Sequence, residues 1–210
     1  MKMHFFSIIT LFFVLSFTIS CVGLRQDVTT DTIPEIPAKI VVEKPELPVY
    51  IMSIGKISAE KMANFLLLYN LQINEDYVHR LAEIYIEEAA FEGVNHDIAF
   101  TQMCLETGFL RFGGDVKPEQ FNFAGLGAIG GGEPGLSFPD PRTGVRAQVQ
   151  HLKAYGSEAP LNGELVNPRF RFVRRGSSPT IEGLAGTWAA DRQYAVKINT
   201  MLQRLYDFAF

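Results

Sequence analysis

Three segments in the middle of the chain carry apolar residues at three- and four-residue spacing, the period of an amphipathic helix. Ser58, Asn74 and Asn95 stand before these segments, where a side-chain oxygen can accept a hydrogen bond from a free N–H group of the first turn. Gly93 and Gly108 follow the second and third segments, and glycine tolerates the left-handed backbone common at helix ends. The pattern therefore predicts three consecutive helices.

The pattern changes after the third predicted helix. Residues 109–143 contain glycine and proline at short intervals, including three consecutive glycines at 130–132, so long regular elements are not expected there. Helical periodicity returns over about 145–155 and again over 193–208. We therefore expect a mainly α (α+β) fold, in which a small loop-rich or hairpin lobe is inserted between the third helix and the next.

The N-terminal end carries a signal of a different kind. Lys2 precedes residues 5–19, an apolar run without a charged residue, as in a secretory signal peptide. The run is shorter than the roughly 20 residues that a membrane-spanning helix needs. Residues 15–21 resemble a bacterial lipobox, in which the chain is cleaved before a cysteine that becomes lipid-modified. We expect a signal peptide over 1–20 and a lipid on Cys21; the alternative is a plain signal peptide with an incidental cysteine.

A linker is expected between the lipid and the folded domain. Residues 21–53 contain several prolines and no sustained helical period, so this segment can extend and hold the domain away from a membrane. The folded domain is assigned to 54–210. These features predict an exported lipoprotein of the cell envelope, periplasmic or associated with the outer membrane, that acts on a polymer beyond its anchor.

Charge and cysteine content exclude some partners and chemistries. The net charge of −4 argues against a nucleic-acid partner, because phosphate binding depends on clustered lysine and arginine. Cys104 lies in an apolar run and is expected to be a small buried hydrophobic residue. The four histidines show no metal-ligand spacing, so we expect no metal and no cofactor. We expect a monomer.

Glu106 is the candidate for acid chemistry. It is the only charged residue between Ile98 and Thr107, on a helix that is otherwise apolar on nearly every face. Burial and the negative end of the helix dipole both favour its protonated form. A carboxylic acid that is still protonated near neutral pH can give its proton to the leaving oxygen of a glycosidic bond. The alternative is a structural glutamate paired with Arg111.

Three blocks of sequence resemble one enzyme family. Residues 99–108, AFTQMCLETG, are similar to the A-x-x-Q-x-x-L-E-T-G stretch of the glucosaminidases of glycoside hydrolase family 73. Residues 122–126 are similar to its N-L-F-G-I block, and residues 188–198 to its Y-A-T-D-P-x-Y-A-x-K-I block, with Arg192 in place of the usual proline. The blocks follow the family's order and span about half of the chain.

The resemblance implies a lysozyme-like fold and an endo-β-N-acetylglucosaminidase that cuts the β-1,4 bond after N-acetylglucosamine in peptidoglycan glycan strands. By that resemblance Glu106 is the general acid and Tyr194 is a tyrosine of the cleft. Asn122 and Phe123 would shape the cleft near the scissile bond, and Trp188 would offer an aromatic face to a sugar ring. Three of these residues have structural alternatives: Asn122 can stabilise a turn, Trp188 can belong to the core, and Tyr194 can be a buried tyrosine whose hydroxyl satisfies a backbone group.

The second carboxylate and the exact activity stay open. Glu133, on the glycine-rich loop, is the candidate for the second catalytic carboxylate, with Asp140 behind it; alternatively the substrate's acetamido group assists. Two other functions compete with hydrolysis. A lytic transglycosylase also uses one glutamate at a helix end of a lysozyme-like fold, and an inactive glycan-binding lipoprotein would bind without turnover.

Overall fold

The computed structural model of the protein describes residues 44–210, so the predicted signal peptide and Cys21 lie outside the described residues. The described part contains five α-helices and three single-turn 3-10 helices, with isolated β-bridges but no strand. The α-helices are α1 (Ala59–Tyr69), α2 (Glu75–Glu92), α3 (His96–Glu106), α4 (Pro141–Gly156) and α5 (Tyr194–Ala209). The prediction of a mainly helical, lysozyme-like domain is confirmed. Of the helices in residues 44–210, none is long and apolar enough to span a membrane.

The predicted caps of the first three helices are confirmed. The Ser58 hydroxyl accepts a hydrogen bond from Lys61 N, and Asn74 and Asn95 accept equivalent bonds in α2 and α3. Gly93 ends α2 with φ of 76°, a left-handed conformation that costs glycine little. These ends are set by local side-chain chemistry, which explains why the sequence alone locates them.

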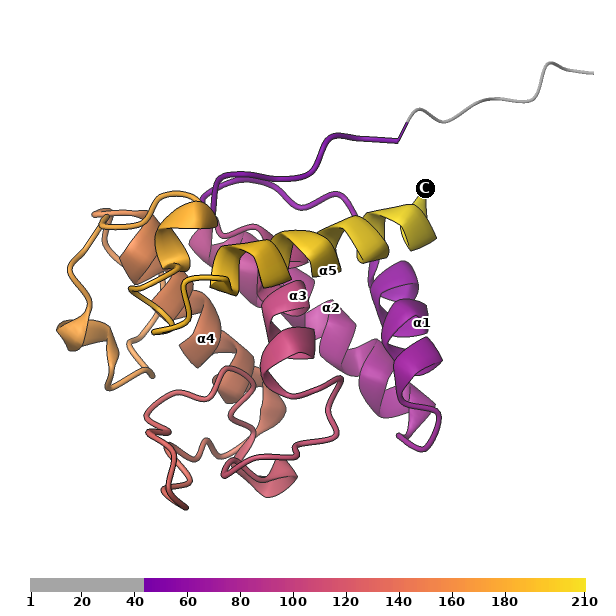
Figure 1. Ribbon diagram of the computed structural model, residues 1–210, viewed down its shortest axis with the longest axis horizontal. Helices are drawn as coiled ribbons and strands as arrows, with labels where there is room; N and C mark the ends of the chain where they lie inside the picture. Colours follow the sequence, from indigo (N-terminus) through magenta and orange to yellow (C-terminus); the bar gives the residue numbers. More distant parts are fainter. Residues whose placement is uncertain (1–43) are drawn as a thin grey trace, which may run out of the picture. The chain divides into compact units, whose positions relative to one another are not determined.

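Helix α3 is the central helix of the domain. It contacts α2, α4 and α5, and all residues from His96 to Cys104 are buried (Figure 1). A helix surrounded by other helices can be apolar on every face, whereas a surface helix needs a polar stripe. Its C-terminal end points toward the irregular segment, so Glu106 lies where the core meets that segment.

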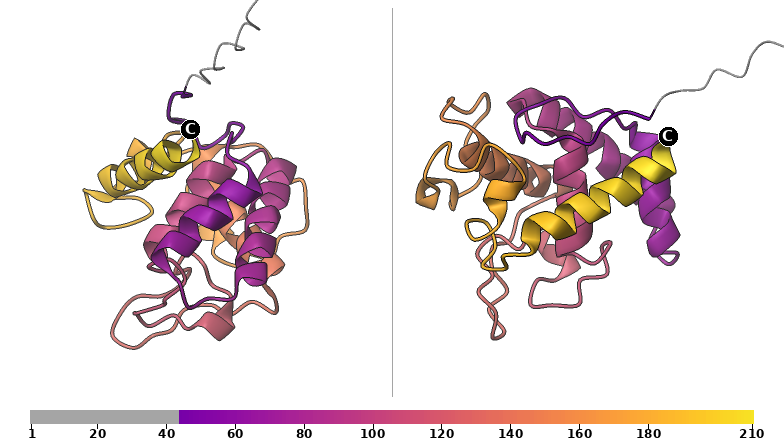
Figure 2. Two further views of the ribbon diagram at one scale, coloured as in Figure 1. Left: turned by 90° about the vertical axis from the view of Figure 1, so that its right-hand side faces the viewer. Right: turned by 45° about the horizontal axis from the view of Figure 1, so that its top comes forward.

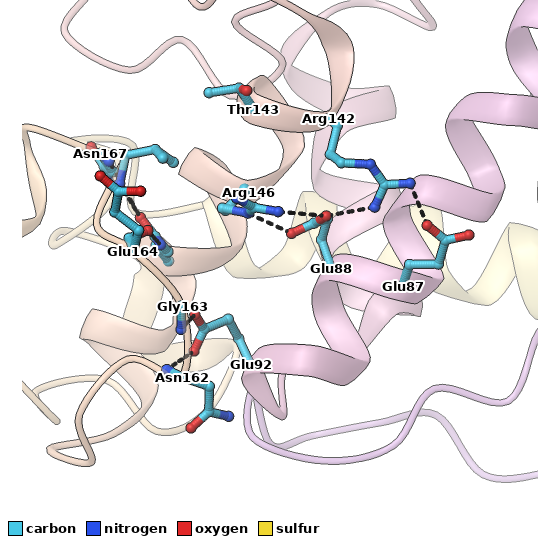
Figure 3. Close-up of polar contacts among 12 residues, drawn as sticks. Glu87, Glu88, Glu92, Arg142, Thr143, Arg146, Asn162, Gly163, Glu164 and Asn167 are labelled. Carbon is cyan, nitrogen blue, oxygen red and sulfur yellow. Dashed lines mark hydrogen bonds and ion pairs between the residues drawn. The ribbon is translucent and has the colours of Figure 1, made fainter.

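Two clusters of charged side chains fix α4 against α2, and Figure 3 shows the first, around Glu88. The buried Glu88 carboxylate accepts bonds from Arg142 Nη1 at 2.7 Å and Arg146 Nε at 2.8 Å. Burial alone would raise the pKa of Glu88, but the hydrogen bonds from Arg146 and Arg142 outweigh it and hold this pKa below its usual value. In the second cluster Lys153 Nζ donates to Glu92 Oε2 at 2.7 Å, with both side chains almost fully buried.

Helix α4 begins at Pro141, four residues before the predicted start. Asp140 caps it: Oδ1 accepts from Thr143 N at 2.9 Å and Oδ2 from the Thr143 hydroxyl at 2.8 Å. These bonds, led by the backbone bond from Thr143, hold the pKa of Asp140 below its usual value. The first turn of α4 carries little apolar periodicity, so the helix start was visible only as an aspartate followed by proline at the first helical position.

The segment between α3 and α4 forms the loop-rich lobe, which extends from one end of the helices (Figures 1 and 2). An isolated bridge between Gly130 and Glu133 closes a tight turn, and Leu136 N donates to Leu126 O at 2.9 Å. The lobe packs directly on α4 at Gly144, where an added Cβ would lie 1.9 Å from the carbonyl oxygen of Phe121. The prediction of a loop-rich or hairpin lobe is confirmed.

The last residues of the predicted linker contact the helical domain. Ile51 is fully buried, its N–H donates to Pro179 O at 3.0 Å, and its carbonyl accepts from Asn95 N at 2.8 Å. Tyr50 forms an antiparallel bridge with Thr180. This stretch therefore ties the start of α3 to the segment that leads into α5.

Candidate active site

A cleft of about 520 Å³ opens where three parts of the chain meet: the C-terminal end of α3, the loop-rich lobe and the N-terminal end of α5. Its polar and charged lining residues are Glu106, Thr107, Asp115, Asn122, Trp188, Tyr194 and Lys197. Two predicted site residues occupy helix ends here, since Glu106 is the last residue of α3 and Tyr194 the first of α5. The fold thus brings together residues from all three sequence blocks at one end of the central helix.

Glu106 and Tyr194 are in direct contact. The Tyr194 phenol donates a hydrogen bond to Glu106 Oε1 and accepts one from Gln102 Nε2 at 2.9 Å. Gln102 lies one turn before Glu106 on α3 and is fully buried. Tyr194 is 5% exposed, so its ring belongs to the core while its hydroxyl reaches the cleft.

The surroundings of Glu106 favour its protonated form. Glu106 is an exposed residue at the cleft, but its carboxyl group lies against the Tyr194 phenol and the Trp188 indole. This desolvation raises the pKa of Glu106 above its usual value, against the opposing hydrogen bonds from Tyr194 and Trp188 and the charge of Lys197. The expected direction is confirmed, and burial is the dominant cause.

The alternative of a structural ion pair for Glu106 is not found among the described residues. The Arg111 side chain bonds within its own loop, where Nε donates to Gly108 O at 2.9 Å. Lys197 lines the cleft but pairs with Asp191 Oδ2 at 2.6 Å. Glu106 therefore meets two neutral donors, the Tyr194 phenol and the Trp188 indole, and the open cleft, a setting suited to a proton donor.

Trp188 also lines the cleft and is half-buried. Its ring packs edge-on against His151, with centroids 4.9 Å apart and an angle of 75°, and lies 5.8 Å from the Tyr155 ring. Burial lowers the pKa of His151 to about 4, so this histidine is neutral in the pH range of most cells. The aromatic cluster fixes the position of the indole at the cleft.

Asn122 and Phe123 lie side by side in sequence but have different surroundings. Asn122 is buried and holds the lobe: its Nδ2 donates to Leu126 O and Leu136 O, and its Oδ1 accepts from Leu126 N at 2.8 Å. It also lines the cleft. Asn122 therefore stabilises a turn and contributes to the cleft wall. Phe123 is 1% exposed, packs near Tyr85, and is not among the cleft-lining residues.

The cleft lining includes a carboxylate that the sequence did not single out. Asp115, on the loop after α3, lines the cleft together with Glu106. Glu133 is exposed at the bridge that closes its turn and is not among the lining residues, and Asp140 is occupied as the cap of α4. The only sequence signal for Asp115 was a carboxylate in an irregular segment, which is shared by many surface residues.

Other chemistries have little support in residues 44–210. That part of the chain contains no group of three histidine, cysteine, aspartate or glutamate side chains placed to hold a metal ion. Cys104 is fully buried, and burial raises the pKa of its thiol well above the usual value, which suppresses the reactive thiolate. The expectation that Cys104 is a small buried hydrophobic residue is confirmed.

Comparison with known proteins connects this site to a family. The model of the glucosaminidase family, described as mannosyl-glycoprotein endo-beta-N-acetylglucosaminidase, matches residues 82–207. A curated protein of Borreliella burgdorferi, described there as an uncharacterized protein, is 41% identical over 180 residues, which cover 86% of this chain and 87% of the relative. No solved structure matches the chain. The matched region contains Glu106, Tyr194 and the whole cleft, and the chain belongs to the glucosaminidase family, glycoside hydrolase family 73.

Proposed function

We propose that the protein is an endo-β-N-acetylglucosaminidase that hydrolyses the GlcNAc-β-1,4-MurNAc bond of peptidoglycan, with Glu106 as the general acid. The observation that carries the proposal is the state of Glu106, a carboxyl group in a cleft with a raised pKa and a neutral phenol as its hydrogen-bond partner. The family match supports the reaction class. The cleft volume of about 520 Å³ is within the range of small-molecule sites.

The chemistry follows from this arrangement. Glu106 gives its proton to the glycosidic oxygen while the bond from that oxygen to the anomeric carbon breaks, which leaves Glu106 as a carboxylate. The Tyr194 phenol stabilises that new charge because it already donates to Oε1. A water molecule then adds its oxygen to the anomeric carbon and loses a proton to a base.

Three groups can assist the attack of water on the anomeric carbon. Asp115 is favoured by its position, because it lines the cleft with Glu106. Glu133 stays a candidate, since a carboxylate on a glycine-rich loop can move toward bound substrate. Assistance by the substrate's acetamido group is the third route.

We also propose that the enzyme is an exported, monomeric lipoprotein attached to a membrane of the cell envelope through Cys21. The proposal rests on the lipobox-like segment and the proline-containing linker. An anchored enzyme with an extended linker can reach a polymer network that lies beyond the membrane.

Mass spectrometry of the products from purified peptidoglycan tests the activity. Hydrolysis as proposed gives fragments that end in a reducing N-acetylglucosamine. Anhydro-muramyl ends would instead identify a lytic transglycosylase, and binding without cleavage at any pH would identify a glycan-binding protein. Either of these two results would overturn the proposed function.

A further inference from the structure

A buried chain of hydrogen bonds links Glu106 to the far side of the core. It crosses four helices, since Tyr85 is on α2, Gln148 on α4, Gln102 on α3 and Tyr194 on α5. Tyr85, Gln148 and Gln102 are fully buried and Tyr194 is nearly so. The bonds run from Tyr85 OH to Gln148 Oε1 at 2.6 Å, from Gln148 Nε2 to Gln102 Oε1 at 2.8 Å, from Gln102 Nε2 to Tyr194 OH at 2.9 Å, and from Tyr194 OH to Glu106 Oε1.

One backbone carbonyl sets the direction of this chain. The same Gln148 nitrogen lies 2.9 Å from the carbonyl oxygen of Ala99 in α3. A carbonyl oxygen can only accept, so the end of Gln148 that faces it must be the NH₂ group. The Gln102 atom that faces this NH₂ must then be an oxygen, and the other end of the Gln102 amide must be its NH₂ group.

The orientation of the Gln102 amide determines how the Tyr194 hydroxyl is oriented. Because Gln102 presents an NH₂ group, the Tyr194 oxygen accepts from it and the phenol proton must point elsewhere. Glu106 Oε1 is the acceptor in reach. Burial, reinforced by the nearby carboxyl group of Glu106, raises the pKa of Tyr194 well above its usual value, so the phenol keeps the proton that it donates.

We propose that Gln148 and Gln102 are positioning residues that make Tyr194 a one-way donor to Glu106 Oε1 and thereby hold the acid proton on Oε2, the oxygen left for the substrate. This inference rests on the proposed role of Glu106. A free phenol could rotate and accept the proton of a neutral carboxyl group, which would leave the acid proton directed at Tyr194. The chain removes that unproductive arrangement, and in a buried site such an orientation is strongly held.

The test uses Gln102→Met and Gln148→Met, which keep side-chain length and remove the amide. In Gln102→Met the phenol loses its donor, and in Gln148→Met the Gln102 amide loses the contact that sets its direction. In both variants the phenol can then accept a hydrogen bond from neutral Glu106. The protonated form of Glu106 gains a partner, so its pKa rises further. The pKa of Glu106 is measured by NMR titration of protein labelled with ¹³C at the glutamate carboxyl carbons. The Glu106 signal is identified as the one that is missing from the spectrum of Glu106→Gln. We expect the turnover number to fall by about 10-fold, less than for direct loss of a donor, and its alkaline limit to move to higher pH.

Tyr85→Phe is the matched control. It also removes a buried hydrogen bond of the chain, but on the far side of Gln148, whose direction is still fixed by the Ala99 carbonyl. We expect its melting temperature to fall while the Glu106 pKa and the pH profile stay unchanged. The other groups around Glu106, namely the Trp188 indole, Lys197 with its partner Asp191, and Asp115 in the cleft lining, are the same in all variants.

The outcomes are distinct. A raised Glu106 pKa in both methionine variants and an unchanged value in Tyr85→Phe supports the proposal. An unchanged Glu106 pKa in the methionine variants, or an equal shift in Tyr85→Phe, overturns the proposal. The row of hydrogen bonds would then have only a structural role. If Gln148→Met does not fold, Gln102→Met against Tyr85→Phe decides alone. The titration needs no turnover, so it gives its answer even if the protein proves not to cleave glycan.

Discussion

The phenol of Tyr194 donates a hydrogen bond to Oε1 of Glu106 across 88 positions of the chain, joining the first residue of α5 to the last residue of α3. The sequence left two descriptions of this tyrosine open, a cleft residue and a buried residue with a satisfied hydroxyl. Both are correct. Its ring is in the core, and its hydroxyl is the link between the core and the acid.

Tyr194→Phe should therefore affect both stability and rate. It leaves the buried Gln102 amide without its acceptor, which should cost about 1 kcal/mol of unfolding free energy. Turnover should fall roughly 10- to 1,000-fold, because a preorganised donor to Glu106 is lost. The Tyr194 bond lowers the pKa of Glu106, so its loss raises that pKa and moves the alkaline limit of activity upward. Melting curves and pH–rate profiles on one preparation measure all three, and unchanged turnover would remove Tyr194 from the site.

The two candidate bases can be ranked by substitution. Asp115→Asn should lower turnover by at least ~10-fold while Glu133→Gln stays near wild type, because Asp115 lines the cleft and Glu133 does not. Azide rescue of a truncated variant, Asp115→Ala, would support a role in activating water, since a small anion can occupy the vacated space. The reverse ranking would show that the glycine-rich loop closes onto the substrate. Wild-type rates in both variants would favour assistance by the acetamido group.

Much of the fold is encoded in local signals. The caps at Ser58, Asn74 and Asn95 and the left-handed end at Gly93 depend on short-range bonds, so the helix boundaries there follow from sequence. The central position of α3 follows from its lack of a polar face. The proposed role of Glu106 came from that same pattern together with the family blocks.

The features of the fold and of the candidate site that the sequence did not predict depend on contacts between distant segments. Gln148 meets Gln102 across 46 positions, and nothing in either local sequence marks the pairing. Asp115 lines the cleft together with residues of α5, which lie far away in the chain. The early start of α4 was missed because Asp140 and Pro141 give a capping signal without apolar periodicity.

The ion pairs between α2 and α4 predict a specific pH dependence of stability. Glu88→Gln should lower the unfolding free energy at neutral pH by about 2 kcal/mol, less than the loss of a fully buried pair because both guanidinium groups are partly exposed. The folded-state pKa of Glu88 is lowered, so its contribution is present above the unfolded-state pKa and disappears as the pH falls through the folded-state value.

Chemical denaturation of wild type and Glu88→Gln at several pH values measures this difference. The two curves should converge in acid. Glu83→Gln is the control, since Glu83 forms an exposed pair with Arg80 and its loss should cost at most about 0.5 kcal/mol. A difference that stays constant into acid would show that Glu88 acts through packing and not through its charge.

Cys21→Ser tests the proposed anchor. In a bacterial host supplied with a labelled fatty acid, wild type should incorporate label and sediment with membranes, whereas the variant should do neither. Stable attachment needs the several acyl chains of a modified cysteine, because one chain binds weakly. Cys104→Ser, at the buried cysteine, should keep the label. A Cys21→Ser protein that still sediments with membranes would mean that the N-terminal apolar segment is the anchor.

Glu106→Gln tests the central claim most directly. The substitution keeps the shape of the side chain and removes only the transferable proton. We predict at least a ~100-fold loss of turnover on purified peptidoglycan. Glu60→Gln, at an exposed residue of α1, should keep wild-type turnover.

The stability of Glu106→Gln should change in the opposite sense to its activity. Because the folded-state pKa of Glu106 is raised, the wild type loses stability as the pH rises through that value, and the glutamine variant should be the more stable protein above it. The decisive measurement is turnover and unfolding free energy of Glu106→Gln on one preparation. The account predicts a folded, equally or more stable protein with almost no hydrolysis, and hydrolysis within a few-fold of wild type would contradict it.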